Sequence, residues 1–448
     1  MKKYYSFTPV ITVTADSKMN NDSVKLMWNG FTHRSGSIDF VAGNDFTFTY
    51  GDPSISLLPD NKEYVLHVDE KGIFIIGKDY GGLMRGFMSL LMKIKHEGDL
   101  LKVEAIHEES NYLLKNRMFH LCVFPDNDLL FIKKIVRLAA ACQYTHIVIE
   151  FWGMLKYDCM KELAWPQAFS KDQAFEVIKE AKELGLEPIP MSNQLGHATS
   201  ARGCYGRHVV LDQNPRYHYL FTPDGWAWNI YSDKVKVLLR TIRKELYDLF
   251  GDGEYMHLGC DEAYIISHDP DLRKGLLDYL ASLTSEVEAE GRRPMIWMDM
   301  LLEKNRFEGC YCAGEKDEVE FIRNSTAKAT VFVDWQYGAY ETPVPSLFSL
   351  KDSGHDVIGA PWSNDRNYKA VINTVNQNSM FGIMYTTWHT IKSDIKSILG
   401  CAKELGAVTF DWSKFSRPDM ETATLLRCIC SDFSDYEDFG WAKHEIDF

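Results

Sequence analysis

The segment "YMHLGCDEAY" (Tyr255–Tyr264) begins as an apolar, strand-like run and ends in two adjacent carboxylates, Asp261 and Glu262. The stretches on either side, residues 232–250 and 271–291, repeat apolar residues at helical spacing, which predicts two amphipathic helices. A short buried strand between two such helices is typical of α/β proteins. The fold class predicted from this segment is therefore α/β.

The same alternation of strand and helix runs through the chain from Tyr112 onward. Eight short β-branched or aromatic runs are each followed by a helical stretch, and eight such units close a (β/α)8 TIM barrel. An open doubly wound sheet is the alternative, but it usually has about five or six strands and a glycine-rich first turn. This sequence shows neither feature, so we predict the barrel. The eight predicted strands are Asn116–Val123, Thr145–Phe151, Glu187–Asn193, Tyr255–Glu262, Pro294–Met300, Thr330–Tyr337, Asp356–Trp362 and Gly382–Trp388.

The first 108 residues have a different pattern. Strand-like runs at Pro9–Asp16 and Asn44–Gly51 precede residues 63–94, which alternate as a hairpin around "DEKG" and become helical after Gly81. Strands followed by a helix predict a small α+β domain packed on the barrel. The expected division is a small domain at residues 1–108 and a barrel with a C-terminal helical extension at residues 109–448.

Charge and composition exclude several classes of partner. The 448 residues carry 49 basic and 63 acidic side chains, a net charge of −14, whereas nucleic acids and anionic membranes demand clustered Lys and Arg. No stretch reaches the roughly 18 to 20 apolar residues of a membrane span, and the N-terminus lacks a signal-peptide core. We expect a cytoplasmic protein; a chain shortened by removal of its export signal is the alternative. The sequence leaves the oligomeric state open, a homodimer included.

Polar and aromatic residues gather where a barrel builds its active site, at the C-terminal ends of the strands. The last four predicted strands carry or end at an indole, and a ring of indoles suits the apolar face of a pyranose. The first strand carries Arg117. The other candidates at or after strand ends are Glu150, Trp152, Asn193, His197, Asp261, Glu262, Trp297, Asp299, Asp334, Trp335, Tyr337, Trp362, Trp388 and His389.

The adjacency of Asp261 and Glu262 has a geometric consequence. Neighbouring residues on a regular strand point to opposite faces, so both acids reach one cavity only where the strand has ended. Two close carboxylates repel, and burial near indoles raises the pKa of at least one of them. One protonated acid beside an ionised partner is the pair that acid-catalysed glycoside cleavage requires. A helix cap or a surface ion pair is the alternative for such a dipeptide.

Five segments carry a resemblance to a known family. "HLGCDE" (His257–Glu262) resembles the H-x-G-G-D-E signature of glycoside hydrolase family 20, the β-N-acetylhexosaminidases, with the closest likeness to the hexosaminidase D-like branch. Ile189–His197, Met295–Leu301 and Trp335–Gly338 resemble third-, fifth- and sixth-strand segments of that branch. Residues 63–94 resemble part of the small domain that precedes the barrel in this family.

The resemblance implies retaining removal of terminal β-linked GlcNAc or GalNAc from a glycan or glycoconjugate, without metal or cofactor. This family is an exception to two-carboxylate hydrolysis, because the 2-acetamido oxygen of the substrate attacks and forms an oxazolinium. Glu262 would be the general acid and base, Asp261 would orient the acetamido N–H, and Tyr337 would bind its oxygen. Asp299 and the four indoles Trp297, Trp335, Trp362 and Trp388 would contact the sugar. Arg117 would grip the distal hydroxyls, while Glu150 would polarise His197, and His257 would support the acids from behind.

Three residues depart from the family pattern. Cys260 replaces the second Gly of the signature, Gln336 replaces an Asp between Trp335 and the next tyrosine, and no Glu follows Trp388 by two positions. Two other functions stay open from the sequence alone. One is a metal-dependent barrel hydrolase or isomerase using His257, Asp261, Glu262 and Asp299; the other is a non-catalytic sugar-binding relic.

Overall fold

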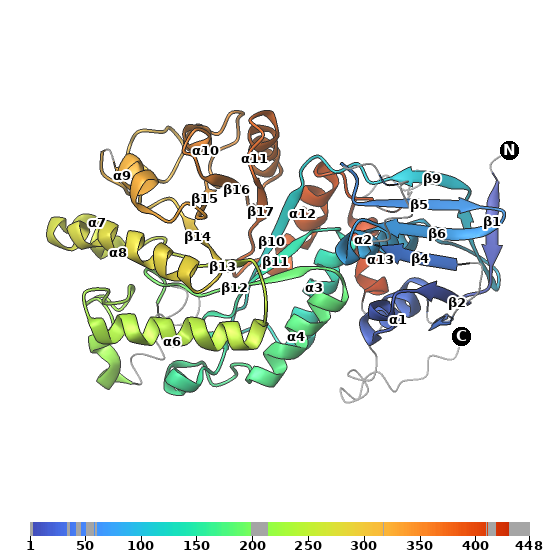
Figure 1. Cartoon of the computed structure of the whole chain (residues 1–448), viewed down its shortest axis with the longest axis horizontal. Coiled ribbons are helices and arrows are strands. Elements are labelled where there is room, and N and C mark those ends of the chain that lie inside the picture. Colours follow the sequence, from blue (N-terminus) through green and yellow to red (C-terminus); the bar gives the residue numbers. More distant parts are fainter. Residues whose placement is uncertain are drawn as a thin grey trace.

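The computed structural model has two parts, a barrel and a smaller β-rich domain (Figure 1). It describes residues 3–33, 36–41, 46–50, 58, 61–198, 214–316, 318–408, 410 and 418–429. Five of the eight residues in the predicted run Asn44–Gly51 fall inside this set, and residues 44, 45 and 51 lie outside it.

The larger part is a closed barrel of eight parallel strands, which confirms the predicted fold class. Each strand pairs with the next along the chain, and the first strand pairs with the last through Arg117 and Ile383. The strands are β10 (Asn116–Cys122), β11 (His146–Glu150), β12 (Glu187–Met191), β13 (Tyr255–His257), β14 (Arg293–Trp297), β15 (Val331–Trp335), β16 (Asp356–Ala360) and β17 (Gly382–Tyr385).

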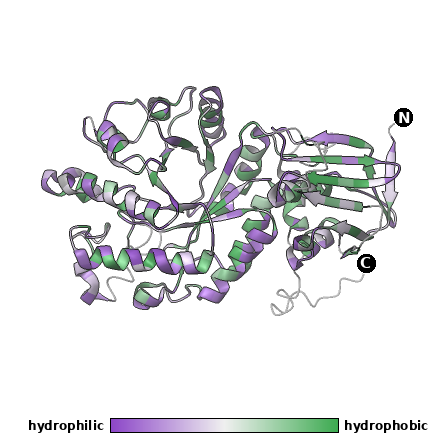
Figure 2. Ribbon diagram, viewed as in Figure 1, coloured by the Kyte–Doolittle hydropathy of each residue, from purple (hydrophilic) through white to green (hydrophobic). Residues whose placement is uncertain are grey.

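Helices surround the barrel and present their apolar sides to it. Ser170 caps α4 through a reciprocal hydrogen-bond pair with Gln173, as the "SKDQ" sequence suggests. Figure 2 shows hydrophobic and hydrophilic residues alternating along helices such as α6. The helices are α3 (Leu129–Ala141), α4 (Lys171–Glu183), α6 (Asp233–Phe250), α7 (Tyr264–His268), α8 (Pro270–Ala289), α9 (Glu318–Ser325), α10 (Pro345–Leu350), α11 (Asp365–Gln377) and α12 (Ile391–Glu404). Short 3-10 turns are η1 (Ser17–Met19), η2 (Trp152–Met154), η3 (Asp158–Leu163) and η4 (Pro215–Leu220).

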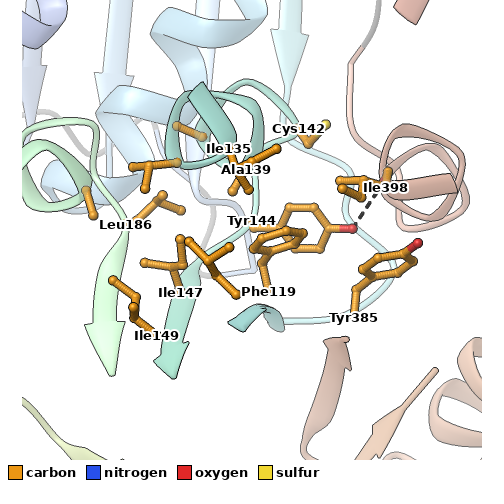
Figure 3. Packing of buried hydrophobic residues seen from close by; sticks show 14 of the residues in the cluster. Phe119, Ile135, Ala139, Cys142, Tyr144, Ile147, Ile149, Leu186, Tyr385 and Ile398 are labelled. Carbon is orange, nitrogen blue, oxygen red and sulfur yellow. Dashed lines mark hydrogen bonds between the residues drawn. The ribbon is translucent and has the colours of Figure 1, made fainter. Parts of the chain in front are cut away.

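Alternation along the barrel strands divides the core into two layers. On β10, Met118 faces the barrel interior, whereas Phe119 packs outward. The outer layer joins β10 and β11 to helices α3 and α12, where the Tyr144 hydroxyl donates to the Ile398 carbonyl (Figure 3). Because inward side chains such as Met118 fill the barrel, a cleft has to lie outside its interior.

The small domain contains two sheets. The larger has the strand order β3-β2-β4-β6-β5-β9, and its β5–β6 hairpin confirms the turn predicted around "DEKG". Helix α2 begins at Tyr80, whose preceding Asp79 accepts from the Gly82 N–H. The second helix, α1, was not predicted. These elements are β1 (Tyr4–Phe7), β2 (Val10–Ala15), α1 (Asp22–Phe31), β3 (Ser37–Phe40), β4 (Phe46–Tyr50), β5 (Tyr64–Asp69), β6 (Gly72–Gly77), α2 (Tyr80–Lys93), β7 (Lys95–Glu97), β8 (Leu100–Glu104) and β9 (Ile106–Glu109).

The last described helix, α13 (Pro418–Cys428), lies at the junction of the two parts. It contacts α3 and α12 of the barrel and α1 of the small domain. Because β9 extends to Glu109, we propose that the domain boundary lies between β9 and β10 rather than at residue 108. Within the described residues, no helix has the length and apolar character needed to cross a membrane.

Candidate active site

The two acids lie in a loop, because β13 ends at His257 rather than at Glu262 as predicted. The backbone after the strand turns through positive φ at Gly259 (64°), Cys260 (76°) and Glu262 (49°). Non-glycine residues rarely adopt this conformation, and such strain clusters at functional sites. The turn brings both side chains to the barrel mouth, which is the reason the sequence tolerates two acids here.

Two glycines allow the third- and fourth-strand loops to pack together. A Cβ on Gly196 would lie 1.9 Å from the Asp261 carbonyl oxygen, and one on Gly259 would lie 1.9 Å from Asn193 Oδ1. Only glycine permits these approaches. The "LGH" and "HLG" segments are therefore needed to bring His197 against the acids.

His197 bridges the two acids with one nitrogen. Its Nε2 lies 3.3 Å from Asp261 Oδ2 and 3.0 Å from Glu262 Oε2. Asp261 is buried, whereas His197 and Glu262 are partly open to the cleft. Three titratable groups thus share a single polar cluster at the end of β13.

The electrostatics of this cluster keep His197 positively charged. Burial lowers the pKa of His197, but the Asp261 and Glu262 carboxylates outweigh burial and raise it from 6.5 to about 10. Burial raises the pKa of Asp261, His197 opposes that rise, and the neighbouring Glu262 and Glu150 charges add to it. The protonated imidazole of His197 therefore lies between two acidic side chains and can donate from one nitrogen to either of them.

The backbone of Glu262 is held on both sides. Its N–H donates to Asp299 Oδ2 at 3.0 Å, and its carbonyl accepts from the Trp226 indole at 2.7 Å. Asp299 is fully buried, and burial together with the Asp261 charge holds the pKa of Asp299 well above its usual value. The other Asp299 oxygen accepts from the Trp335 indole at 3.2 Å. Asp299 thus positions an acid and an indole and lies behind the cleft lining.

The acids open into an aromatic cleft of about 380 Å³. Seven predicted residues line it: His197, Asp261, Glu262, Trp335, Tyr337, Trp362 and Trp388. Trp388 donates its indole N–H to the Tyr337 hydroxyl at 3.0 Å, and Trp362 donates to Asp394 at 3.0 Å. Two further candidates from strand ends, Trp152 and His389, also line the cleft. The structure adds Phe124, Trp226 and Tyr264, which the sequence did not indicate.

Trp297 and His257 lie beneath this cleft and outside its lining. The Trp297 side chain is buried among the inward residues of the barrel, with its ring centroid 4.6 Å from His257 and 6.2 Å from His120. Burial and the neighbouring His120 hold the pKa of His257 well below its usual value, so His257 is neutral. The position of His257 behind the acids fits its predicted supporting role, whereas Trp297 is buried below the cleft and does not reach the lining where a sugar contact was predicted.

The predicted contact between Glu150 and His197 is wrong. Glu150 Oε2 lies 3.1 Å from His120 Nε2, and Oε1 accepts from the Asn193 side-chain amide. His197 Nδ1 has no hydrogen-bond partner among the described residues. Both oxygens of Glu150 are therefore used by other groups, and the acids alone polarise His197.

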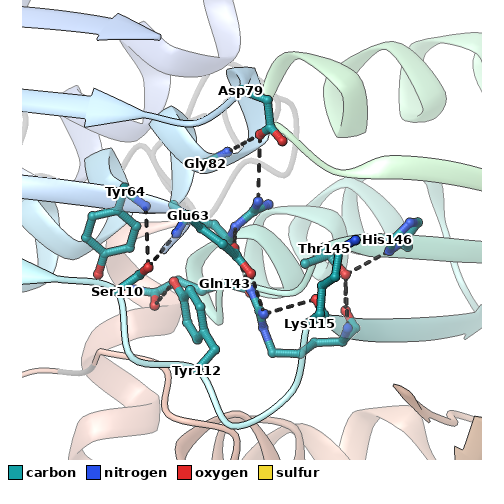
Figure 4. Close-up of polar contacts among 12 residues, drawn as sticks. Glu63, Tyr64, Asp79, Gly82, Ser110, Tyr112, Lys115, Gln143, Thr145 and His146 are labelled. Atoms are coloured by element: carbon teal, nitrogen blue, oxygen red, sulfur yellow. Dashed lines mark hydrogen bonds and ion pairs between the residues drawn. The ribbon is translucent and has the colours of Figure 1, made fainter. Parts of the chain in front are cut away.

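The predicted role of Arg117 as a sugar ligand is also wrong. Arg117 is the second residue of β10, at the opposite end of the strand from the cleft. Its guanidinium is 2% exposed and pairs with Glu63 of the small domain at 2.8 Å. It also donates to the Leu114 carbonyl and lies over the Tyr112 ring (Figure 4 labels Glu63 and Tyr112). Arg117 instead joins the two domains.

Two departures from the family pattern have structural explanations. Cys260 is buried, donates its thiol to the Leu258 carbonyl at 3.4 Å and does not line the cleft. Gln336 is buried too, and its amide binds the backbone N–H and C=O of Tyr311 at 2.6 and 2.9 Å. Neither side chain reaches the space available to a sugar.

The ligand set proposed for a metal enzyme is not assembled. His257 points its Nδ1 to the Gly259 N–H at 3.1 Å and lies below the acids. Among the described residues, one atom each of His197, Asp261 and Glu262 lies within 4.8 Å of the others, a spacing that a cation could bridge. A cation bound there would have to displace the proton that the Asp261 and Glu262 carboxylates hold on His197.

Comparisons with known proteins find a matching family model and solved structures with the same fold. The model of "Glycosyl hydrolase family 20, catalytic domain" matches residues 142–402. The lacto-N-biosidase of Bifidobacterium bifidum is 20% identical over 415 residues, which cover 80% of this chain and 36% of the relative. The chain therefore spans about a third of the length of that relative.

Solved structures share the fold at low identity. The Streptomyces plicatus N-acetyl-β-hexosaminidase in complex with Thio-NAglucal is 14% identical, with a TM-score of 0.68 over 96% of this chain and 93% of that one. The Bacteroides fragilis β-N-acetylhexosaminidase is 15% identical, with a TM-score of 0.67 over 99% and 94%. The hexosaminidase D-like branch is not tested by these matches and stays a prediction. The family model covers more than half of the sequence, and the chain belongs to glycosyl hydrolase family 20.

Proposed function

We propose that this protein is a retaining exo-β-N-acetylhexosaminidase that removes terminal β-linked GlcNAc or GalNAc by substrate-assisted catalysis. The observation that carries the proposal is the His197 bridge between Asp261 and Glu262 at the mouth of an aromatic cleft. Family membership supports a glycoside hydrolase, and two carboxylates in one sugar-sized cleft are the groups that such chemistry uses.

The spacing of the acids disfavours both ordinary glycosidase mechanisms. Inverting enzymes separate two carboxyls by about 6.5–9.5 Å to hold a water, and ordinary retaining enzymes place them about 5–5.5 Å apart on either side of the bond. Here the two acids are adjacent in the chain and both contact the same His197 nitrogen, so they do not face each other across a bond. A nucleophile from another source fits this arrangement, and the substrate's own acetamido oxygen supplies it.

The first step uses the two acids differently. The acetamido oxygen attacks the anomeric carbon, the bond from that carbon to the leaving oxygen breaks, and Glu262 gives its proton to that oxygen. Asp261 accepts a hydrogen bond from the acetamido N–H and stabilises the positive charge of the oxazolinium. Asp261 is buried beside His197, so its orientation is fixed before the substrate arrives.

The second step restores the acids. Glu262, now a carboxylate, takes a proton from water, and the water oxygen attacks the anomeric carbon from the face that the leaving group vacated. The oxazolinium ring opens, so two inversions give net retention. His197 faces the same carboxylate at 3.0 Å and steadies its charge between the two steps.

The indoles define where the acetamido group lies. Trp335, Trp362 and Trp388 line the cleft around Tyr337, above the buried Trp297. The Tyr337 hydroxyl accepts from the Trp388 indole, and this contact fixes the phenol in the wall where the acetamido oxygen would lie. Apolar rings around the methyl group favour 2-acetamido sugars over plain hexosides.

The test is a panel of aryl β-GlcNAc, β-GalNAc and β-glucoside substrates, each with and without EDTA. We expect turnover of one or both acetamido sugars, little turnover of the glucoside, and no effect of EDTA. Equal rates on the glucoside contradict substrate assistance. Loss of activity in EDTA supports the metal enzyme, and binding of a GlcNAc thiazoline without any turnover supports the sugar-binding relic.

A further inference from the structure

A buried histidine beneath the cleft has no part in the proposed mechanism. His120 lies on β10 two residues after the inward-facing Met118, and its side chain is fully buried. Its ring centroid lies 4.9 Å from that of Trp388, with the planes at 58°, and 6.2 Å from that of Trp297. Trp388 lines the cleft, whereas His120 does not. His120 therefore contacts the cleft wall from behind.

Glu150 fixes the orientation of this imidazole. The Oε2 atom of Glu150 lies 3.1 Å from His120 Nε2, and its Oε1 atom accepts from the Asn193 amide. Glu150 is itself 1% exposed, so the contact between the two side chains is shielded from competing water. Because the ring cannot rotate about its Cβ–Cγ bond without breaking the Nε2 contact, Glu150 sets the angle at which the ring meets Trp388.

A second contact ties the His120 backbone to the segment that carries the same tryptophan. The Thr387 hydroxyl, one residue before Trp388, donates to the His120 carbonyl at 2.9 Å. The Trp388 indole in turn donates to the Tyr337 hydroxyl at 3.0 Å. A continuous set of contacts therefore runs from the barrel interior to the tyrosine that binds the acetamido oxygen in the proposed mechanism.

The chemistry of the His120–Glu150 pair suits orientation better than stability. A buried imidazole and carboxylate lose their hydration, and replacing buried charged pairs by apolar side chains of similar volume is often neutral or stabilising. Met118 shows that an apolar side chain fits the interior face of the same strand. Apolar packing is non-directional, whereas a hydrogen bond specifies an angle. The pair therefore gives the ring a fixed direction against Trp388.

We propose that His120 is a positioning residue that sets the selectivity for 2-acetamido sugars. It acts by holding Trp388, and through Trp388 it holds Tyr337, beside which the acetamido group binds. The inference rests on the proposed function, and it gives Glu150 a role toward Trp388 in place of the expected one toward His197. Because His120 lies behind the wall, its removal should weaken the binding of the acetamido group and spare the contacts of the rest of the sugar.

The test compares two iminosugar inhibitors that share the ring and differ at C2. The first, 2-acetamido-1,2-dideoxynojirimycin, carries the acetamido group, whereas the second, 1-deoxynojirimycin, carries a hydroxyl. The Kd of the second divided by the Kd of the first, measured by calorimetry, reports acetamido selectivity and needs no turnover. We expect this ratio to fall about tenfold in His120→Leu, equivalent to about 1.4 kcal/mol, because the aromatic contact with Trp388 is lost.

A second variant covers the case in which His120→Leu folds poorly. The single change leaves the buried Glu150 carboxylate without its histidine, whereas His120→Leu combined with Glu150→Leu removes the whole pair. The double variant should therefore unfold at a urea concentration no lower than that of the single variant. If the two residues act as one unit, Glu150→Leu alone should also lower the ratio, and the double variant should match His120→Leu.

His146 provides a matched control at the other end of the barrel. It is the first residue of β11, is buried, and its Nε2 lies 3.4 Å from Glu187 Oε2, so His146→Leu also breaks a histidine–carboxylate pair. The ratio should stay unchanged in this variant. If His120→Leu and the double variant bind both inhibitors equally less well, or bind both as the wild type does, the positioning role is overturned and the proposed function stands. If the wild type itself does not prefer the acetamido inhibitor, the proposed function fails and this inference fails with it.

Discussion

The Glu262 backbone N–H donates to the Asp299 side chain at 3.0 Å, and this contact ties the proposed proton donor to the loop that follows β14. The second oxygen of the same carboxylate accepts from the Trp335 indole. Glu262 has a positive φ of 49°, a conformation that its own side chain disfavours. Asp299 therefore helps to hold a strained backbone and a cleft wall in one arrangement.

Replacing Asp299 by Asn should lower kcat more than it alters KM. An amide has one accepting oxygen, so one of the two N–H donors loses its partner, at a cost of about 1–3 kcal/mol in a buried site. We expect kcat to fall about tenfold or more with a twofold change in KM at most. Steady-state kinetics on an aryl acetamido sugar checks this split. A larger change in KM than in kcat would show that Asp299 serves binding instead.

Glu262→Gln should remove general acid and base assistance while keeping the shape of the cleft. Such assistance contributes roughly 10²- to 10⁴-fold in rate, so kcat should fall by that factor. The matched control is Glu254→Gln, an exposed residue at the other end of β13, which should retain full activity. A Glu262→Gln enzyme that keeps most of its rate would show that another residue donates the proton.

Stability should fall with rising pH because of His197. Its pKa in the folded protein is about 10, above the unfolded value of 6.5, so the folded state holds the proton more tightly. This contribution is complete below pH 6.5 and is lost as the pH rises toward 10, at up to about 1.4 kcal/mol per unit. Urea unfolding of wild type and His197→Gln between pH 6 and 10 measures it. Parallel curves for the two proteins would contradict the ion-pair assignment.

Arg117→Met should destabilise the protein without changing substrate affinity. The guanidinium is buried and pairs with Glu63 across the domain junction, so its loss should cost about 3 kcal/mol. Arg216→Met removes a 65% exposed partner of Glu162 and should cost less than about 1 kcal/mol. Denaturant titration gives both values. If the folded Arg117→Met enzyme shows a higher KM, Arg117 contacts the sugar after all.

The fold and the position of the acids were predictable because both follow from local periodicity. Strand and helix spacing identified all eight barrel strands, and adjacency placed Asp261 and Glu262 beyond the end of β13. The wrong predictions concern which side chains lie close together in space, and local sequence patterns do not show this. Arg117 belongs to a correctly predicted strand, but it is the second residue of that strand. At 3.3 Å per residue, its Cα lies about 17 Å from the C-terminal end of the strand, where the cleft is.

The sequence also did not show which buried polar groups form hydrogen bonds with one another. Glu150 faces the barrel interior as its strand alternation requires, yet the sequence does not show that His120 and Asn193 occupy its oxygens. Trp226 was missed because it comes from a long loop with no strand before it, and only the fold brings its indole to Glu262. The sequence "GWAW", with two tryptophans two positions apart between the third and fourth predicted strands, was the one signal in the sequence that could have indicated Trp226.

The proposed mechanism depends on attack by the substrate's own amide oxygen. The most direct measurement is kcat/KM for aryl β-glucosaminides whose N-acetyl group carries zero, one, two or three fluorines. Each fluorine withdraws electrons from the amide oxygen, so the rate should fall steeply along the series while the leaving group stays constant. A rate that is unchanged from acetyl to trifluoroacetyl would show that the amide does not take part in the reaction.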